Sequence, residues 1–272
     1  MKNLSRSVTL ALLLALAAMP AFAGVHYKSV TRNQDANGKS LGDMAVEGWV
    51  TGSNARVEVT ASDNPILKKG TFLVTKDGGK TLYLVDPKEK TYGEWDVQAM
   101  LGAAGAMLNS MGPLVKMEFS DPKVEKLAED AGPTIAGLPT RHFKYRTSYT
   151  MKMKVMGMGQ ESAVVSEQDL WVTDKINDAA LGVWLRNTPP KTGNEQLDKL
   201  IDSEIGKVTG YPMKMVTVST STSKKGKATV TRSTMEVTEL DTNANVTASF
   251  DVPAGYEEVP MMMPMAQPGS RQ

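Results

Sequence analysis

Residues 142–155 have the sequence HFKYRTSYTMKMKV, and this segment is the strongest indication of the fold class. Aromatic and apolar residues alternate in it with basic and hydroxyl residues. A period of two places successive side chains on opposite faces of a strand. Fourteen residues at roughly 3.3 Å each would span about 46 Å, which exceeds a typical strand. A strand of this length is expected to twist and coil, as in a barrel or half-barrel.

Other strand-like segments flank this one, and turn residues separate them. Residues 162–173 are expected to return beside it, and residues 211–221 and 227–240 to form a second long pair. Asx-Gly and Gly-Gly turns indicate hairpins, and connections this short cannot make parallel crossovers. The sequence therefore predicts a mainly β fold with helices (α+β), built on one long, curved antiparallel sheet. The shorter predicted strands are residues 25–31, 45–51, 56–61, 71–75, 81–85 and 91–95.

Three segments have the apolar spacing of helices. Asp96 can cap a helix over Val97–Met111, whose large residues recur at i, i+3 and i+4 and whose other face is small. This helix has almost no charge, so we expect it to be covered by protein or to cover a cavity itself. Residues 176–186 and 196–205 show shorter versions of the pattern. These helices are expected to close the curved sheet into a half-barrel.

The two ends of the chain are expected to lie outside this domain. Residues 1–23 have the layout of a secretory signal peptide, with basic residues, an apolar segment and a cleavage site after Ala23. The apolar segment is shorter than the roughly 20 residues that cross a bilayer, so we expect no transmembrane span. Residues 24–259 are expected to form a single half-barrel domain, and residues 260–272 a disordered tail rich in Met and Pro.

Composition excludes several classes of site. The chain has no cysteine, which excludes disulfides, thiolate metal sites, a thiol nucleophile and a lipid anchor at the cleavage site. Residues 1–23 hold two of the 31 basic residues and none of the 30 acidic ones, so the exported chain is near neutral. Such a chain has no electrostatic footprint for nucleic acid. We expect a periplasmic protein, with secretion as the alternative, and its clusters Lys68-Lys69 and 224–227 to be solvated loop charges.

The sequence gives few signs of catalysis. It contains no P-loop, dinucleotide-binding glycine pattern, nucleophile elbow or zinc-protease motif. His26 and His142 are too few for a multi-histidine metal site, and His142 is expected on the solvent face of its strand. Glu167 and Asp169 are expected to share a solvated strand face, and no further residue favours a glycosidase-like use of that pair. We therefore expect a protein that is not an enzyme and that needs no cofactor or metal.

Methionine is the most informative residue type, with 18 in the chain. One interpretation is ordinary packing, because Met fills irregular cores. A second is an adaptable apolar cavity, since flexible thioethers suit surfaces that accept varied ligands. A third is Cu(I) binding by thioethers, for which Met151 and Met153 share a strand face about 6.6–7 Å apart. Copper requires exposed sulfurs, whereas the alternation predicts that both residues are buried beside Tyr149.

Four segments carry a resemblance to known proteins. Residues 73–92 combine an Asp-Gly turn, an aromatic strand and an Asp-Pro turn, and the hairpin over residues 48–59 precedes them. Residues 169–173 and the closing Phe-x-x-Pro-x-Gly at residues 250–255 follow in the same order. Together they resemble the LolA/LolB-like periplasmic lipoprotein carriers and an uncharacterised secreted bacterial family similar to them. The resemblance implies a half-barrel whose helices close its concave side, and a lid-holding arginine for which Arg56 is the nearest match.

These inferences combine into one functional expectation. We expect a non-enzymatic protein that binds a lipid or other apolar ligand between the concave face of the sheet and a lid helix. The alternatives are a Met-rich Cu(I)-binding periplasmic protein, and a structural or partner-binding module with a protein partner in the cell envelope. The residues expected to line the cavity are Met100, Met107, Met111, Phe143, Tyr145, Tyr149, Met151 and Met153.

Overall fold

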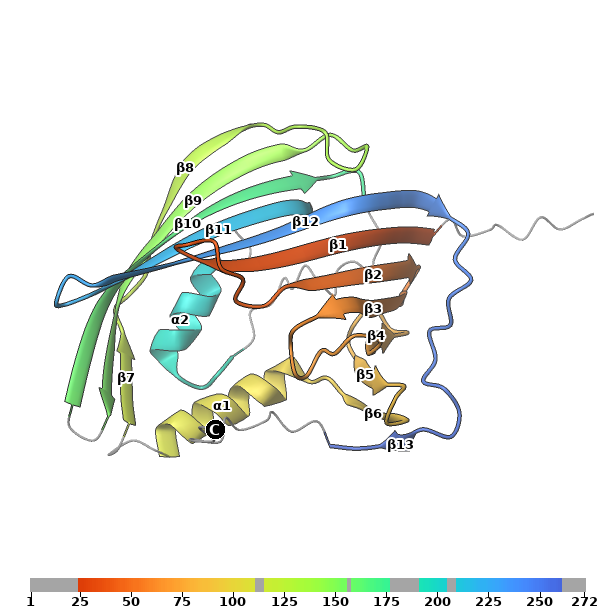
Figure 1. Cartoon of the computed structure of the whole chain (residues 1–272), viewed down its shortest axis with the longest axis horizontal. Coiled ribbons are helices and arrows are strands. Elements are labelled where there is room, and N and C mark those ends of the chain that lie inside the picture. Colours follow the sequence, from red (N-terminus) through yellow and green to blue (C-terminus); the bar gives the residue numbers. More distant parts are fainter. Residues whose placement is uncertain (1–23, 111–114, 156–157, 177–190, 205–208, 261–272) are drawn as a thin grey trace, which may run out of the picture.

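The computed structural model describes residues 24–110, 115–155, 158–176, 191–204 and 209–260. These residues form a long, open, curved sheet of thirteen strands, with two helices on its concave side (Figure 1). The mainly β fold predicted from the sequence is confirmed. The helix expected over residues 176–186, the leader at residues 1–23 and nearly all of the tail lie outside the described residues.

The order of elements follows the predicted succession of hairpins. The strands are β1 (Gly24–Asp35), β2 (Met44–Thr51), β3 (Asn54–Ser62), β4 (Phe72–Thr75), β5 (Tyr83–Asp86), β6 (Thr91–Glu94), β7 (Val115–Phe119), β8 (Lys123–Ala131), β9 (Arg141–Val155), β10 (Met158–Thr173), β11 (Tyr211–Ser223), β12 (Ala228–Ala244) and β13 (Glu257–Glu258). The helices are α1 (Val97–Ser110) and α2 (Glu195–Glu204), as expected from their apolar spacing. Each predicted long strand is thus present among the described residues.

The sheet joins two halves of the chain through its first strand. Its order is β13-β6-β5-β4-β3-β2-β1-β12-β11-β10-β9-β7, and β8 also pairs with β9. β1 lies between β2 and β12, so the short hairpins continue directly into the four long strands. β9 is long enough to hold β7 along one half of its edge and β8 along the other. The pairing is antiparallel throughout, apart from the two-residue parallel pair of β13 with β6.

Three strands were not anticipated, β7, β8 and β13, and all three lie at an edge of the sheet. β8 has the sequence KVEKLAEDA and is exposed along nearly all of its length, so its side chains show no alternation between a buried and a wet face. β7 follows the lid helix closely and pairs with the far half of β9. A strand that is solvated on both faces carries no period-two signal, because no face of it has to be apolar.

The core lies on the concave face of the first strands. Val25 and Tyr27 of β1 pack there with Val50, Val57 and the fully buried Met213, and Ile135 covers them from the loop before β9. A smaller cluster of Phe72, Val74 and Val85 lies on the opposite face. Val252 and Tyr256 cover that second cluster as the chain descends from β12 to β13 (Figure 1). The part of the sheet that contains the short strands therefore has a hydrophobic cluster on each face.

Candidate functional site

Helix α1 is attached to the segment that precedes α2. The side-chain amide of Gln98 pairs with the backbone of Lys191: its Nε2 donates to the carbonyl oxygen at 2.6 Å, and the Lys191 N–H donates to its Oε1 at 2.8 Å. Gly105 lies directly against Thr192, where a Cβ atom would overlap the Thr192 carbonyl oxygen. The interior glycine, costly in a helix, is therefore explained by this close approach.

The start of α2 is fixed by a group of polar side chains. Asn194 caps the helix, and its Oδ1 accepts a hydrogen bond from the Leu197 N–H at 3.0 Å. Oδ1 of Asp198 accepts from the backbone N–H of Thr192 at 2.6 Å and from its hydroxyl at 2.7 Å. Burial opposes ionisation of Asp198, but these hydrogen bonds outweigh it, and the pKa of Asp198 lies below its ordinary value. Residues 191–194 are thus bonded to α1 through Gln98 and to α2 through Asp198.

α2 also holds the edge of the sheet. Oε1 of Gln196 accepts a hydrogen bond from the backbone N–H of Phe119 at 2.8 Å, at the end of β7. An edge strand otherwise presents such groups to solvent. α1, residues 191–194, α2 and β7 therefore form one connected layer, which lies across the concave side of the sheet (Figure 1).

The predicted cavity residues on β9 share the concave face but differ in burial. Phe143 and Tyr145 are buried, and the Arg141 guanidinium lies 5.1 Å from the centre of the Phe143 ring. Tyr149, Met151 and Met153 are only half-buried. These three residues thus offer the accessible apolar surface of β9.

The remaining predicted residues are placed as follows. Met100 of α1 is half-buried, whereas the side chain of Met107 and all of Met111 lie outside the described residues. Arg56 has its guanidinium 3.5 Å from the centre of the Phe72 ring and 3.1 Å from a Glu58 carboxylate oxygen. The register puts Arg56 on the face opposite Val57 and the concave core. Among the described residues, Arg56 makes no hydrogen bond or ion pair with α1.

β7 adds two residues that the sequence reasoning missed. Met117 pairs directly with Met153, and Phe119 with Met151, on the same face of the sheet. The Phe119 ring lies 6.2 Å from that of Tyr149. The alternation of Val115, Met117 and Phe119 with charged residues was the available signal, but five residues are too few to separate it from chance.

Next to this apolar row, the concave face is rich in hydroxyl groups. Ser162 pairs with Met151, and Ser166 with Ser219, so all of these side chains point to one side. Thr217 continues the row across β11. The described concave face is therefore mainly apolar along β7 and β9, whereas across β10 and β11 uncharged polar side chains alternate with apolar ones such as Val164, Leu170 and Met215.

The opposite face of β9 carries an ion-pair network rather than freely solvated charges. The ring nitrogens of His142 lie 3.0 Å from Asp130 and 2.8 Å from Asp169. Arg146 contacts Glu167 at 2.7 Å, and Lys144 lies 3.3 Å from the same carboxylate. Hydrogen bonds from Arg146 and Lys144 lower the pKa of Glu167.

This arrangement corrects the expectation of a plain solvent face. The His142 side chain is 17% exposed, and its ring stacks on Trp171 with centroids 4.8 Å apart. Glu167 and Asp169 share one face, as expected, but Glu167 is paired with Arg146 and Lys144, and Asp169 lies 3.6 Å from Lys144. The cationic partners lower the pKa of Glu167, whereas the acid of a glycosidase needs a raised pKa. The network therefore stabilises the sheet.

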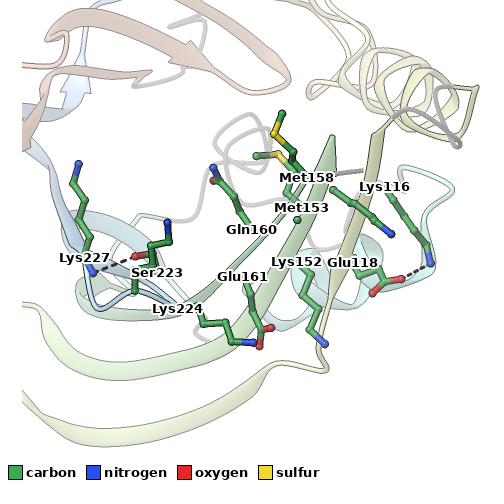
Figure 2. Close-up of a pocket in the computed structure, with 13 residues that line it drawn as sticks. Lys116, Glu118, Lys152, Met153, Met158, Gln160, Glu161, Ser223, Lys224 and Lys227 are labelled. Carbon is green, nitrogen blue, oxygen red and sulfur yellow. Dashed lines mark hydrogen bonds and ion pairs between the residues drawn. The ribbon is translucent and has the colours of Figure 1, made fainter. Parts of the chain in front are cut away.

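A hollow of about 920 Å³ lies at the end of the sheet where the β9–β10 and β11–β12 hairpins turn (Figure 2). Six lysines line it, together with two glutamates, Met153 and Met158. Lys116 and Glu118 form an ion pair at 2.5 Å. From the sequence alone, we expected residues 224–227 to be solvated loop charges. They lie beside β7 and β9 because of the register of the long strands, which the sequence does not show. The lysines are Lys116, Lys152, Lys154, Lys224, Lys225 and Lys227.

No described helix has both the length and the apolar character needed to cross a membrane. Within the same residues, no three His, Asp or Glu side chains are grouped so that they could hold a metal ion.

Comparison with known proteins gives a family but no function. No curated protein matches this chain. The family described as "Domain of unknown function (DUF4412)" matches residues 39–256, which include every described strand apart from β1 and β13. A match over most of the 272 residues shows that the chain is a member of the DUF4412 family.

Proposed function

We propose that this protein is a non-enzymatic binding protein that holds a lipid or other apolar ligand against the concave face of its sheet, beneath α1. The observation that carries the proposal is the half-buried row of Tyr149, Met151 and Met153, with Met117 and Phe119 beside it. Thioether and aromatic side chains left partly open inside a curved sheet provide adaptable apolar area of the kind that ligand sites use.

The hydroxyl groups beside this row favour an amphiphile over a pure hydrocarbon. An acyl chain would lie along β7 and β9, and a polar end would meet Ser162, Ser166 and Ser219 across β10 and β11. Hydroxyls can donate or accept as the ligand requires, so they place few demands on head-group chemistry. The ligand class is therefore a lipid or a similarly built molecule.

Location and architecture are inferred from the chain itself. The leader-like residues 1–23 support export to the periplasm. The order of hairpins and the open curved sheet with helices on its inner side support a half-barrel of the LolA/LolB type. Because the described contacts of Arg56 are with Phe72 and Glu58, a lid-holding arginine does not form part of the proposal.

Native mass spectrometry after mild purification, followed by lipid extraction, tests the proposal directly. A matched pair of variants then locates the site: Met151→Lys places a charge on the concave face, and Val165→Lys places one on the opposite face of β10. Binding of a dansyl-labelled fatty acid should weaken about tenfold or more in the first variant, because a buried charge must be desolvated. Equal binding by the two variants, or a protein purified with an empty and dry interior, would refute the proposal.

A second candidate, Cu(I) binding, is favoured by one observation. Met117 lies directly opposite Met153, and Met151 is the next residue on the same face, so three thioethers lie close together. Soft thioethers select Cu(I). Replacing both Met151 and Met153 by Leu should abolish stoichiometric Cu(I) binding while leaving fatty-acid binding nearly unchanged, since the volumes are similar. Retention of Cu(I) by this double variant would rule out the candidate.

A further inference from the structure

The hollow between the two hairpin tips has a strong excess of positive charge. Six lysines line it against the carboxylates of Glu118 and Glu161. Lys116 is paired with Glu118, and neighbouring Lys152 and Lys154 also help to hold the pKa of Glu118 below its ordinary value. Among the described residues, the other five lysines have no ion-pair partner.

The same end of the molecule exposes an apolar side chain. Met158, the first residue of β10, is 75% exposed, the highest value among the large hydrophobic side chains of the described residues. Figure 2 shows Met158 and Met153 pointing to one side of the sheet and Lys152 to the other, with Lys224 beside Glu161. An exposed, flexible apolar residue at the same end of the sheet as several lysines is a combination suited to the water–lipid boundary.

We propose that this hollow docks the protein on an anionic lipid surface, with phosphate head groups bound among the lysines and Met158 inserted between them. The ammonium groups of Lys224, Lys225 and Lys227 lie on flexible stems at the exposed turn between β11 and β12, so they can turn toward phosphates in the plane of a bilayer. Each lysine near an anionic surface strengthens binding by roughly fivefold, so several together give stable but reversible attachment. The hollow adjoins the concave-face ligand site, because Met153 lines both, but the lysines of the β11–β12 turn lie outside that site.

Sedimentation with vesicles of phosphatidylcholine, with and without phosphatidylglycerol, tests the inference. The full-length exported chain should bind only the mixed vesicles. Changing Lys225 and Lys227 to Gln should weaken binding about 30-fold, whereas the same change at Lys68 and Lys69, in the loop after β3, should alter it less than about twofold. All four side chains are exposed, so neither double variant should disturb folding. Equal loss in both variants, or equal binding to neutral vesicles, would overturn the proposal.

Two further arms separate a lipid surface from other anions. Met158→Ser should weaken vesicle binding severalfold without changing the salt dependence, because it removes only apolar contact. Release of the protein from vesicles by inorganic phosphate at matched ionic strength would identify a site for soluble anions and refute docking on lipid. Fatty-acid binding measured without vesicles should be unchanged in the lysine variants, so failure of the ligand proposal and failure of this one are distinguishable.

Discussion

Two glycines of α1 should respond in opposite ways to the same substitution. A Cβ added at Gly102 meets nothing within 4 Å, so Gly102→Ala should stabilise the helix by about 1 kcal/mol through helix propensity alone. At Gly105 a Cβ would overlap the carbonyl oxygen of Thr192, and backbone cannot move aside as a flexible side chain can. The same gain in propensity is then opposed by a forced separation of α1 from residues 191–193.

The size of the Gly105 effect follows from what that separation breaks. Overpacking costs about 1–3 kcal/mol, and the paired hydrogen bonds between Gln98 and Lys191 add about 1 kcal/mol each when lost. Since these bonds are exposed and water can replace them, the net effect of Gly105→Ala should be a loss of about 1–3 kcal/mol.

Amide hydrogen exchange and urea denaturation measure the local and the global stability of the two variants. Amide exchange in α1 should be faster in Gly105→Ala and slower in Gly102→Ala, and the urea midpoints should move in the corresponding directions. A shift of the same sign in both variants would refute the close packing of α1 on Thr192. If the lid helix also covers the ligand, fatty-acid affinity should fall only in Gly105→Ala.

Three further outcomes are expected for stability. Met213→Ala should cost about 2–5 kcal/mol in urea denaturation, since this side chain is 0% exposed in the main core; a loss below that range would show that the core collapses around the gap. Hydrogen bonds lower the pKa of Asp198 in the folded chain, so its carboxylate stabilises the fold at pH values above the pKa that it has in the unfolded chain. This stabilisation is lost as the pH falls through the pKa of the folded chain. Asp198→Asn should therefore flatten the acid limb of a pH–stability profile. Burial raises the pKa of Tyr211, so stability should fall as the pH rises past the ordinary tyrosine range, and an unchanged alkaline limb in Tyr211→Phe would contradict this.

The sequence predicted the long strands well because each carries its own evidence. β9 alternates over its whole length, and β12 follows Lys225-Gly226, a turn sequence typical of a hairpin. The same holds for α1, which begins after the capping residue Asp96, and whose end was predicted from Gly112-Pro113 in the sequence. Local patterns of this kind depend on neighbouring residues alone, so they can be read before the fold is known.

Features that depend on partners distant in the sequence were invisible. β8 is exposed on both faces and has no period, and β13 is a strand only because β6 lies beside it. His142 looked like a solvent-facing residue, but Asp130 and Asp169 come from strands on either side of it. No local pattern specifies which carboxylates will be brought to a given imidazole.

The candidate sites divide along the same line. Alternation alone placed Tyr149, Met151 and Met153 on one face, because side-chain direction in a strand is a local property. Their contact with Met117 and Phe119, and the gathering of lysines from three separate parts of the chain around one hollow, arise from strand register over long distances in sequence. Register is set by the packing of whole faces against one another, so only the folded sheet determines which side chains meet.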